Sequence, residues 1–326
     1  MRAAYIERFG GPDSIRYGAL PVPAIGPREV LVSAEAMAVN HVDRFVRSAA
    51  YRTPVTFPFV IGRDLVGTIT AVGADVTQFG TGDRVWCNSL GYAGRQGSFS
   101  EYVGVPEDRA YPLPDGIDPV EAVSVLHTLA TAYLGLCREG SIATGDTVFI
   151  GGAGGGVGSS AVQLAAERGA RVLASAAPDD FEWVRSCGAD EVFDYHNDAI
   201  ADLLHERNPS GFDLYWDCSG HHDFVHTIPL MAMRGCIIVA AGLSSADPVP
   251  TGALYTHDLS LRGFAISNAS VEDLRAAAEF INTSFRTRGV NTRIGRILPL
   301  KDAAEAHRLL ETESTRALGG KIVIRP

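Results

Sequence analysis

The chain has few cysteines, and none of them pairs at the spacing of a redox or metal motif. The five cysteines are Cys87, Cys137, Cys187, Cys218 and Cys236. Because they are odd in number, far apart and include no CxxC pair, they indicate neither a disulfide framework nor a cysteine zinc site. The sequence therefore favours a protein of a reducing compartment, and we expect a cytoplasmic location.

A leader and a membrane span are also missing from the pattern. The first ten residues include Arg2, Glu7 and Arg8 and have no apolar core, which does not fit a secretory signal. We find no run of the roughly 18–20 apolar residues that crossing a bilayer requires, so no membrane partner is expected.

Positive charge is scarce. Lys and Arg number 28 against 38 Asp and Glu, which gives a formal net charge of −10. An acidic chain binds phosphodiester backbones poorly, so nucleic acid is not an expected partner. Hydrophobic residues make up 46% of the 326 residues, enough for a sizeable core and for about two domains.

The sequence pattern changes from strand-like to helical near residues 115–120. Before that point, short β-like runs such as residues 29–36, 67–73 and 83–86 are cut by Gly and Pro, which is typical of a barrel or sandwich. Asp118, Pro119 and Glu121 then have the pattern of a helix start, and the helical pattern continues to about residue 136.

Strands and helices alternate from residue 147 onward. The expected strands are residues 147–150, 171–174, 191–193, 214–216 and 236–240, and the expected helices are residues 157–168 and 181–187. Continuous apolar strands that alternate with helices predict an α/β fold with a doubly wound parallel sheet. Two further helices, residues 271–285 and 302–311, precede a final strand that begins at Lys321.

The strongest chemical signal is the glycine-rich run of residues 150–158. It follows a strand and opens a helix, and Ala153, Gly155 and Gly158 fit an A-x-G-x-x-G variant of the dinucleotide fingerprint. Unpaired N–H groups at the helix start would bind the diphosphate. The sequence therefore predicts a dinucleotide site, against the alternative of a glycine-rich turn without a ligand.

The choice of dinucleotide depends on the end of the next strand. NAD sites place Asp or Glu there, whereas this strand ends Ser175-Ala-Ala177 without an acid, which favours NADPH. Asp179 and Asp180 follow closely, and no Lys or Arg lies in the loop, so NADH stays the alternative. Tyr195, His196 and Lys321 are candidate phosphate partners from elsewhere in the chain.

The whole chain resembles the zeta-crystallin-like quinone oxidoreductases, a zinc-independent branch of the medium-chain dehydrogenase/reductase superfamily. The landmarks are residues 39–47, 58–67, 80–85, 97–102, the glycine run, 188–190 with Tyr195, and 320–323. The resemblance implies a GroES-like β-barrel catalytic domain of residues 1–120 plus 265–326. It implies a Rossmann domain of residues 121–264 inserted between them, and a homodimer.

Zinc ligands are not where the zinc-dependent members have them. The segment of residues 37–43 has no Cys, and Arg63-Asp64 stands where those members have His-Glu, so we expect no zinc. One histidine-rich group consists of His221, His222, Asp223 and His226. Its His222 and His226 have the i, i+4 spacing of a helix. We interpret it as a polar loop and not as a metal site.

Without a Lewis acid, a quinone or an α,β-unsaturated carbonyl is the easiest hydride acceptor, because its reduced anion is stabilised. The protein must then orient the acceptor and donate hydrogen bonds to the developing oxyanion. By resemblance, Asn40 and Tyr51 face the nicotinamide, and Arg63 with Asp43 shapes the reaction site. Two alternatives stay open: an enoyl-thioester reductase and a catalytically weak nucleotide-binding structural protein.

The remaining cofactor contacts are also implied by the resemblance. Besides Asn40, they are Thr128, Gly154, Gly155, Gly156, Val157, Ser175, Ala177, Tyr195, Ser219, His221, Gly242, Leu243, Ser244, Phe264, Ile266 and Lys321. Several of these follow strands 214–216 and 236–240, at the carboxyl edge where doubly wound sheets bind ligands.

Overall fold

The computed structural model describes residues 1–287, 289–313 and 315–326. The chain folds into two compact units, residues 1–127 with 269–326 (unit 1) and residues 128–268 (unit 2). The first boundary lies inside helix α2 (Pro119–Tyr133), which explains why no Gly or Pro marks it in the sequence.

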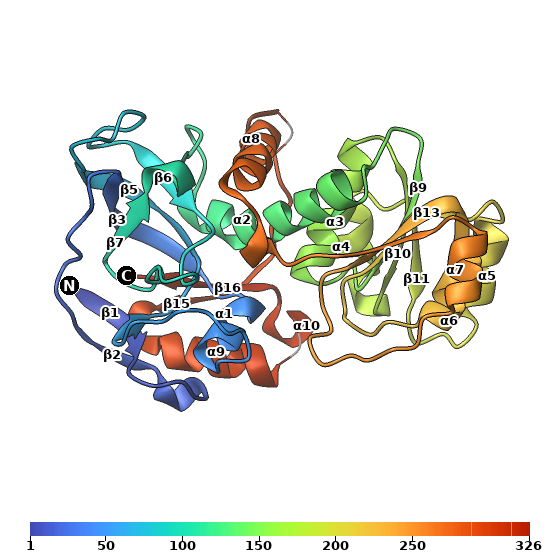
Figure 1. Ribbon diagram of the computed structural model, residues 1–326, viewed down its shortest axis with the longest axis horizontal. Helices are drawn as coiled ribbons and strands as arrows, with labels where there is room; N and C mark the ends of the chain where they lie inside the picture. The colour runs from blue at the N-terminus through green and yellow to red at the C-terminus, as the bar shows by residue number, and fades with distance from the viewer. Residues whose placement is uncertain (288, 314) are drawn as a thin grey trace. The chain divides into compact units, whose positions relative to one another are not determined.

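Two sheets form the frame of unit 1 (Figure 1). A three-stranded antiparallel sheet has the order β2-β1-β4, and a larger sheet has the order β15-β16-β3-β5-β6-β8, with β7 also paired to β3. The strands are β1 (Arg2–Ile6), β2 (Arg16–Ala19), β3 (Glu29–Ala38), β4 (Phe59–Val60), β5 (Asp64–Val72), β6 (Arg84–Cys87), β7 (Tyr102–Pro106), β8 (Tyr111–Pro112), β15 (Ile294–Pro299) and β16 (Lys321–Arg325).

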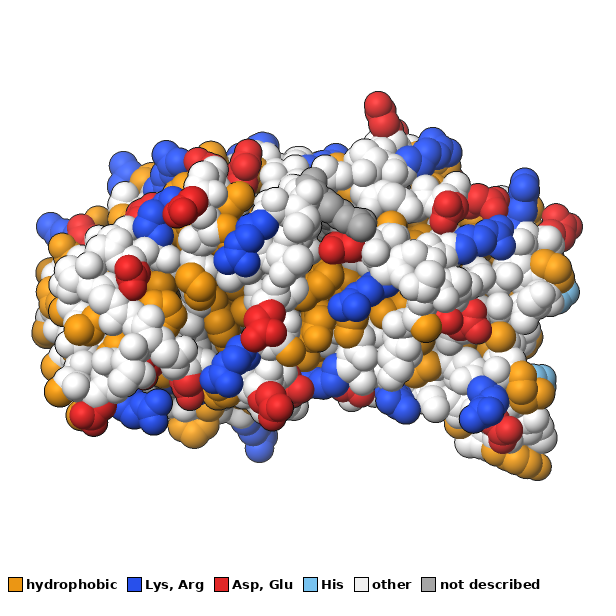
Figure 2. Space-filling view, turned by 90° about the horizontal axis from the view of Figure 1, so that it is seen from above, with side chains coloured by type: hydrophobic (Ala, Val, Ile, Leu, Met, Phe, Trp, Pro, Cys, Tyr) orange, Lys and Arg blue, Asp and Glu red, His pale blue; other side chains and the backbone are white. Residues whose placement is uncertain are grey.

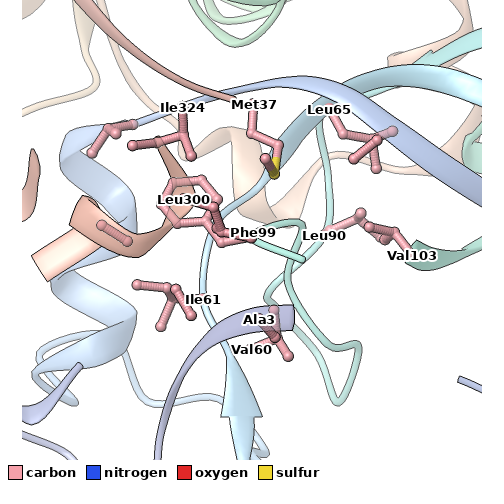
Figure 3. Packing of buried hydrophobic residues seen from close by; sticks show 14 of the residues in the cluster. Ala3, Met37, Val60, Ile61, Leu65, Leu90, Phe99, Val103, Leu300 and Ile324 are labelled. Carbon is pink, nitrogen blue, oxygen red and sulfur yellow. The ribbon is translucent and has the colours of Figure 1, made fainter. Parts of the chain in front are cut away.

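The core of unit 1 follows from strand periodicity. Along β3, buried and half-buried residues alternate, so one side of the strand faces the core. Figure 3 shows the side chains of Met37, Leu65 and Phe99 together with Leu300 and Ile324 from the C-terminal segment. The C-terminal residues therefore return to complete the first domain, as the resemblance implies.

Close backbone contact between strands explains the glycine at position 67 of unit 1. A Cβ atom on Gly67 would lie 2.2 Å from the carbonyl oxygen of Ser33 on β3. Only glycine lets β5 approach β3 this closely. The helices of unit 1 are α1 (His41–Arg47), α8 (Val271–Thr287), α9 (Ala303–Thr312) and α10 (Thr315–Leu318).

Unit 2 is a six-stranded parallel sheet of order β11-β10-β9-β12-β13-β14. Numbered from β9, this is the 3-2-1-4-5-6 order of the Rossmann fold, so the predicted doubly wound sheet is confirmed. The strands are β9 (Thr147–Gly151), β10 (Arg171–Ala176), β11 (Glu191–Asp194), β12 (Phe212–Asp217), β13 (Met231–Val239) and β14 (Ser260–Gly263). The order reverses between β9 and β12, which makes their carboxyl ends the expected ligand edge.

Helices cover both faces of this sheet. Figure 1 shows α3 and α4 on one face and α5, α6 and α7 on the other. These helices are α3 (Gly156–Glu167), α4 (Phe181–Ser186), α5 (Ile200–Arg207), α6 (Phe224–Thr227) and α7 (Thr251–Thr256). The core on the α5 side includes Phe149, Phe212 and Leu204, with Phe149 stacked on Tyr215 at 4.6 Å.

Most expected elements are confirmed, and one expectation is wrong. Asp118 caps α2 as predicted, because its Oδ1 accepts the N–H groups of Val120 and Glu121 at 2.8 and 3.1 Å. However, α2 continues into a π-helical segment, and residues Pro119–Glu139 are long and apolar enough to span a membrane. The expectation that the chain has no apolar run of this length is therefore wrong. Its most apolar window is 83% buried in the structure, as in a helix of a protein core.

Candidate active site

The glycine loop joins β9 to α3 in unit 2. Gly152 has a φ of +65°, a conformation that glycine adopts without strain. The Ala153 N–H donates to the carbonyl of Ser175 at 2.8 Å, which fixes the loop to the end of β10. A Cβ on Gly158 would lie 2.3 Å from the carbonyl oxygen of Gly152, so only glycine lets α3 pack this closely on the loop.

The start of α3 is open to an anion. Gly155 is the N-cap residue and supplies no side-chain oxygen, and the first turn contains no acidic residue. Neither the N-cap residue nor an acid of the first turn therefore takes up the first N–H groups of the helix, and these groups lie at the positive end of the helix dipole. These features fit the diphosphate of a dinucleotide, and Gly154, Gly155, Gly156 and Val157 are the residues that would hold it.

Asp180 lies against the same loop. It ends the 3-10 turn η4 (Pro178–Asp180) after β10, and its side chain is 6% exposed. Its Oδ2 atom lies 2.7 Å from where a Cβ on Gly154 would be. The sequence left open which way Asp179 and Asp180 turn. The structure buries Asp180 beside the glycine loop and leaves Asp179 exposed.

The carboxyl ends of β10 and β11 carry the residues predicted to surround the adenosine ribose. Ser175 and Ala177 are buried, and Ser175 holds the glycine loop through its carbonyl group. Tyr195 is exposed and its ring lies 4.1 Å from that of His196. His196 contacts the Asp194 carboxylate at 2.8 Å, and hydrogen bonds from His196 lower the pKa of Asp194.

The loops after β12 and β13 contact each other at the same edge of the sheet. Ser219 accepts the N–H of His221 at 3.2 Å, and the Ser245 hydroxyl donates to the carbonyl of Gly220 at 3.3 Å. Gly242 has a φ of +81°, and a Cβ there would lie 2.9 Å from the Gly220 oxygen. The structure thus brings Ser219, His221 and Gly242 together, and leaves Leu243 and Ser244 exposed.

Three further predicted contacts have visible structural roles within unit 2. The Ser160 hydroxyl donates to the Thr128 hydroxyl at 2.9 Å, which joins the α2 segment to α3. Phe264 packs edge-on against Trp216 at 5.9 Å, and Ile266 is buried. A hydrogen bond accounts for the position of Thr128, and core packing accounts for Phe264 and Ile266.

Unit 1 contains a buried polar cluster around Asn40, the residue before α1. Its Nδ2 donates to Oδ2 of Asp64 at 2.8 Å, and its Oδ1 accepts from Nζ of Lys321. Its backbone N–H donates to Asp43 Oδ2 at 2.8 Å, which is one half of a capping box. Both ends of the Asn40 amide are therefore engaged within the unit, so Asn40 acts here as the link between Lys321 and Asp64.

Burial sets the protonation of this cluster. Asp64 is fully buried, which raises the pKa of its carboxyl, while the Lys321 ammonium and the Asn40 hydrogen bond oppose the rise. Burial likewise raises the pKa of Asp43 to about 6, against the hydrogen bond from Asn40 and the charge of Arg63. Burial lowers the pKa of Lys321, and Asp64 and Asp43 act in the opposite direction. Such a group of coupled acids and an amine can hold or release a proton near neutral pH.

Arg63 and His127 complete the cluster. Arg63 is buried, faces Asp43 and Asp64 electrostatically, and has its guanidinium 5.5 Å from the ring centre of Tyr92. His127 Nδ1 lies 3.8 Å from Asp64 Oδ1, and burial lowers the pKa of His127. Sequence reasoning named neither His127 nor the place of Asp64 at the centre.

Tyr51 lies nearby in the chain but outside this hydrogen-bond network. Its backbone N–H donates to the carbonyl of Phe45 at 2.9 Å, and the two rings lie 5.4 Å apart. The ring is half-buried against the unit 1 core. These contacts with Phe45 position the Tyr51 ring against α1.

The histidine-rich group follows β12, with His221 and His222 in the loop and His226 in the short helix α6. Asp223 caps the short helix α6 and contacts His226 Nδ1 at 2.6 Å, while His222 Nε2 contacts the Ala241 carbonyl at 3.1 Å. The part of the chain that the structure describes contains no group of three or more His, Cys, Asp or Glu side chains that could hold a metal. The expected absence of zinc stays a prediction.

A cavity of about 350 Å³ in unit 1 is separate from all of these residues. It is lined by η2 (Glu107–Arg109), β8 and one face of α8, including Tyr111 and Asn282. None of the predicted site residues lines it.

Known proteins support the same architecture. A family model described as "Alcohol dehydrogenase GroES-like domain" matches residues 26–115, and one described as "Zinc-binding dehydrogenase" matches residues 156–283. A quinone oxidoreductase of Pseudomonas aeruginosa is 30% identical over 329 residues, covering 97% of each chain.

Solved structures agree over the full length. An NAD-dependent alcohol dehydrogenase is 32% identical with a TM-score of 0.88, and covers 100% of both chains. A mycobacterial protein complexed with NADPH is 29% identical with a TM-score of 0.85, and also covers 100% of both chains.

A Rossmann unit with an open glycine loop, joined to a GroES-like unit, defines an oxidoreductase of the medium-chain dehydrogenase/reductase type. The full-length similarity narrows this class further. The chain belongs to the quinone oxidoreductase family within that superfamily.

Proposed function

We propose that the protein transfers a hydride from a nicotinamide dinucleotide to a quinone or an α,β-unsaturated carbonyl compound, without zinc. The observation that carries the proposal is the glycine loop with its open helix start, in a chain similar over its full length to quinone oxidoreductases. When bound, the nicotinamide supplies the hydride, and the protein supplies binding and orientation.

The residues of the chain divide this work. The glycine loop of unit 2 would bind the diphosphate, and the loops after β12 and β13 would bound the same sheet edge. In unit 1, the cluster of Asn40, Asp64 and Lys321 can hold the proton that must follow the hydride. Solvent can also deliver that proton, so the proposal needs no dedicated general acid.

Observations in unit 2 and in a relative bear on the choice between NADPH and NADH. The lack of an acid at Ala176 and Ala177 supports NADPH, as does the NADPH bound to the mycobacterial relative. The buried carboxylate of Asp180 at the glycine loop supports NADH.

Steady-state assays separate the candidate functions. We expect oxidation of NADPH or NADH with 1,4-benzoquinone or 9,10-phenanthrenequinone to exceed that with crotonyl thioester. Faster turnover of the thioester would instead favour the enoyl-thioester reductase. Absence of turnover with both acceptors, despite dinucleotide binding, would favour the nucleotide-binding structural protein.

The zinc expectation has its own test. Elemental analysis of the purified protein is expected to show no stoichiometric zinc, and dialysis against a chelator is expected to leave quinone turnover unchanged. Stoichiometric zinc that is lost together with activity would contradict the proposed chemistry.

Tyr51 tests the predicted acceptor site. Tyr51→Phe keeps the ring contact with Phe45 but removes the hydroxyl, so we expect quinone kcat to fall by about tenfold with dinucleotide affinity unchanged. Tyr17→Phe, on an exposed tyrosine of β2, is the matched control. An unchanged rate in Tyr51→Phe would remove this hydroxyl from the reaction site.

A cytoplasmic homodimer remains part of the proposal. β14 lies at one end of the unit 2 sheet, and its described residues are mostly exposed, so it offers an edge for pairing with a second copy.

Side chains of both charge signs are interspersed on the face shown in Figure 2, where no broad region of one sign stands out. This distribution supports the expectation that nucleic acid is not a partner.

A further inference from the structure

Two arginines of unit 1 share one serine as their hydrogen-bond partner. The Nε of Arg95 donates to the carbonyl of Ser89 at 3.2 Å, and Nη1 of Arg109 donates to the Ser89 hydroxyl at 3.3 Å. Both arginines are half-buried, and Ser89 is 3% exposed. Two guanidinium groups are therefore gathered around a single buried residue.

These two cations are not paired with a carboxylate. Within the part of the chain that the structure describes, neither guanidinium lies within ion-pair distance of an Asp or Glu side chain. Burial and the charge of Arg109 lower the pKa of Arg95, as does Arg63, while Cys87 and Asp108 act in the opposite direction. Because like charges that are partly removed from water destabilise each other, the arrangement favours an anion as its partner.

The two guanidinium groups also have donors to offer such an anion. A guanidinium carries five N–H donors, and Arg95 and Arg109 each use one nitrogen for Ser89. Their other N–H groups donate to no residue that the structure describes. The planar fork of a guanidinium matches the paired oxygens of a carboxylate, sulfonate or phosphate. The pair therefore fits an oxyanion better than a neutral group.

The turn that carries Arg95 is held against the loop that follows Tyr51. The N–H of Ala93 in this turn donates to the Thr53 hydroxyl at 2.7 Å, two residues after Tyr51. Arg63, which the resemblance places at the reaction site, lies close enough to affect the pKa of Arg95. The arginine pair therefore lies beside the predicted acceptor site and within the same unit.

We propose that Arg95 and Arg109 form an oxyanion subsite, and that the conjugated acceptor which the protein reduces best carries an anionic oxygen group bound there. The inference rests on the proposed function, because it specifies the acceptor of that same reaction. Two sources share this chemistry: an acidic group on the acceptor ring itself, and the phosphates of a coenzyme A thioester.

The first test compares a charged and a neutral quinone in the full-length protein. Initial rates with 1,2-naphthoquinone-4-sulfonate and 1,2-naphthoquinone are measured for the wild type, Arg95→Gln and Arg109→Gln, with the dinucleotide saturating. We expect the wild-type KM to be at least about fivefold lower for the sulfonated quinone. Each variant should raise that KM about tenfold and leave the KM of the neutral quinone within about twofold.

A control and a second pair of acceptors separate the possible sources of charge. Arg8→Gln removes the same charge from an exposed position of unit 1, so both KM values should stay within about twofold of the wild type. Crotonyl-coenzyme A is compared with the neutral N-acetylcysteamine thioester of crotonate in the same way. If the phosphates of coenzyme A are the source, the two arginine variants should raise the KM of crotonyl-coenzyme A alone.

A binding measurement makes the subsite testable without turnover. The affinity for 2-naphthalenesulfonate, which accepts no hydride, is measured by isothermal titration calorimetry beside that for the neutral 2-naphthol. We expect each arginine variant to bind the sulfonate about tenfold more weakly and the naphthol equally well. If a variant misfolds, the wild type is titrated in roughly 0.05 and 0.5 M NaCl, since screening should weaken only the binding of the sulfonate.

The outcomes distinguish the subsite from the reaction. Equal wild-type KM values for the charged and the neutral acceptor of both pairs, or variants that affect both members alike, overturn the subsite and leave hydride transfer in place. Binding of 2-naphthalenesulfonate that is unchanged in both variants also overturns it. Sulfonate binding that needs both arginines, without turnover of any acceptor, supports the subsite and contradicts the proposed function.

Discussion

Replacing Gly155 with Asp is expected to weaken dinucleotide binding by more than about 100-fold, which corresponds to roughly 2.7 kcal/mol. Gly155 is the N-cap residue of α3, and its position contacts little besides the Gly152 carbonyl, 3.3 Å from an added Cβ. A carboxylate there would cap the open N–H groups and repel the diphosphate. Isothermal titration with NADH and NADPH measures the effect.

Two further variants separate charge from bulk. Gly155→Asn has nearly the same shape without the charge, so it should lose less affinity than Gly155→Asp. Gly252→Asp places the same acid in α7, where an added Cβ meets nothing within 4 Å, and should bind normally. Undiminished affinity in a folded Gly155→Asp protein would refute the assignment of the glycine loop.

Replacing Lys321 with Met is expected to lower the free energy of unfolding by about 2 kcal/mol at pH 8, because it leaves the buried Asp64 carboxylate with Arg63 but without the Lys321 ammonium. Denaturant unfolding measures this loss. Lys301→Met, at an exposed position in the turn before α9, should have little effect and is the matched control.

The loss should be larger at pH 8 than at pH 6. Burial raises the pKa of Asp64 from 3.8 to about 8 in the folded state, so stability falls as pH rises between these two values. Lys321 opposes this fall. The pKa of Lys321 is itself lowered on folding, so its own contribution to stability increases as pH rises toward its unfolded value. Lys321→Met removes the ammonium that opposes the fall and also the contribution of Lys321 itself, so both changes make the variant less stable at the higher pH.

A second substitution tests whether the charge is the cause. Asp64→Asn in the Lys321→Met background removes the carboxylate that has lost Lys321 and keeps an oxygen for the Asn40 hydrogen bond. We expect it to restore about half of the lost stability. Equal losses at both pH values, or no recovery in the double variant, would show that Lys321 contributes through packing alone.

The glycine loop was readable from the sequence because its chemistry is local. The strand, the glycine spacing and the following helix all lie within residues 147–167, and each has its own short-range signal. The doubly wound sheet was predictable for the same reason, since its strands are continuous apolar runs. Short edge elements such as β14, whose residues are half-buried or exposed, lack that signal and were missed.

The polar cluster of unit 1 was not readable in the same way. Lys321 and Asn40 are 281 residues apart, and Asn40 and Asp64 are 24 apart, so no periodicity relates them. The resemblance predicted that Lys321 contacts a cofactor phosphate and that Asn40 faces the nicotinamide. The structure shows the two side chains hydrogen-bonded to each other within unit 1. Asp180 was noticed, but only the fold of η4 determines its direction.

Lys321 makes the protonation of the polar cluster in unit 1 accessible to a direct measurement. The sequence contains only two lysines, Lys301 and Lys321, beside 26 arginines. Guanidinium groups keep their proton in proteins, whereas a desolvated amine can lose it near neutral pH. Reductive ¹³C-methylation would therefore give a spectrum with just two lysine signals, one from an exposed turn and one from the cluster. The second signal would report protonation at the centre of unit 1 directly, without any substitution.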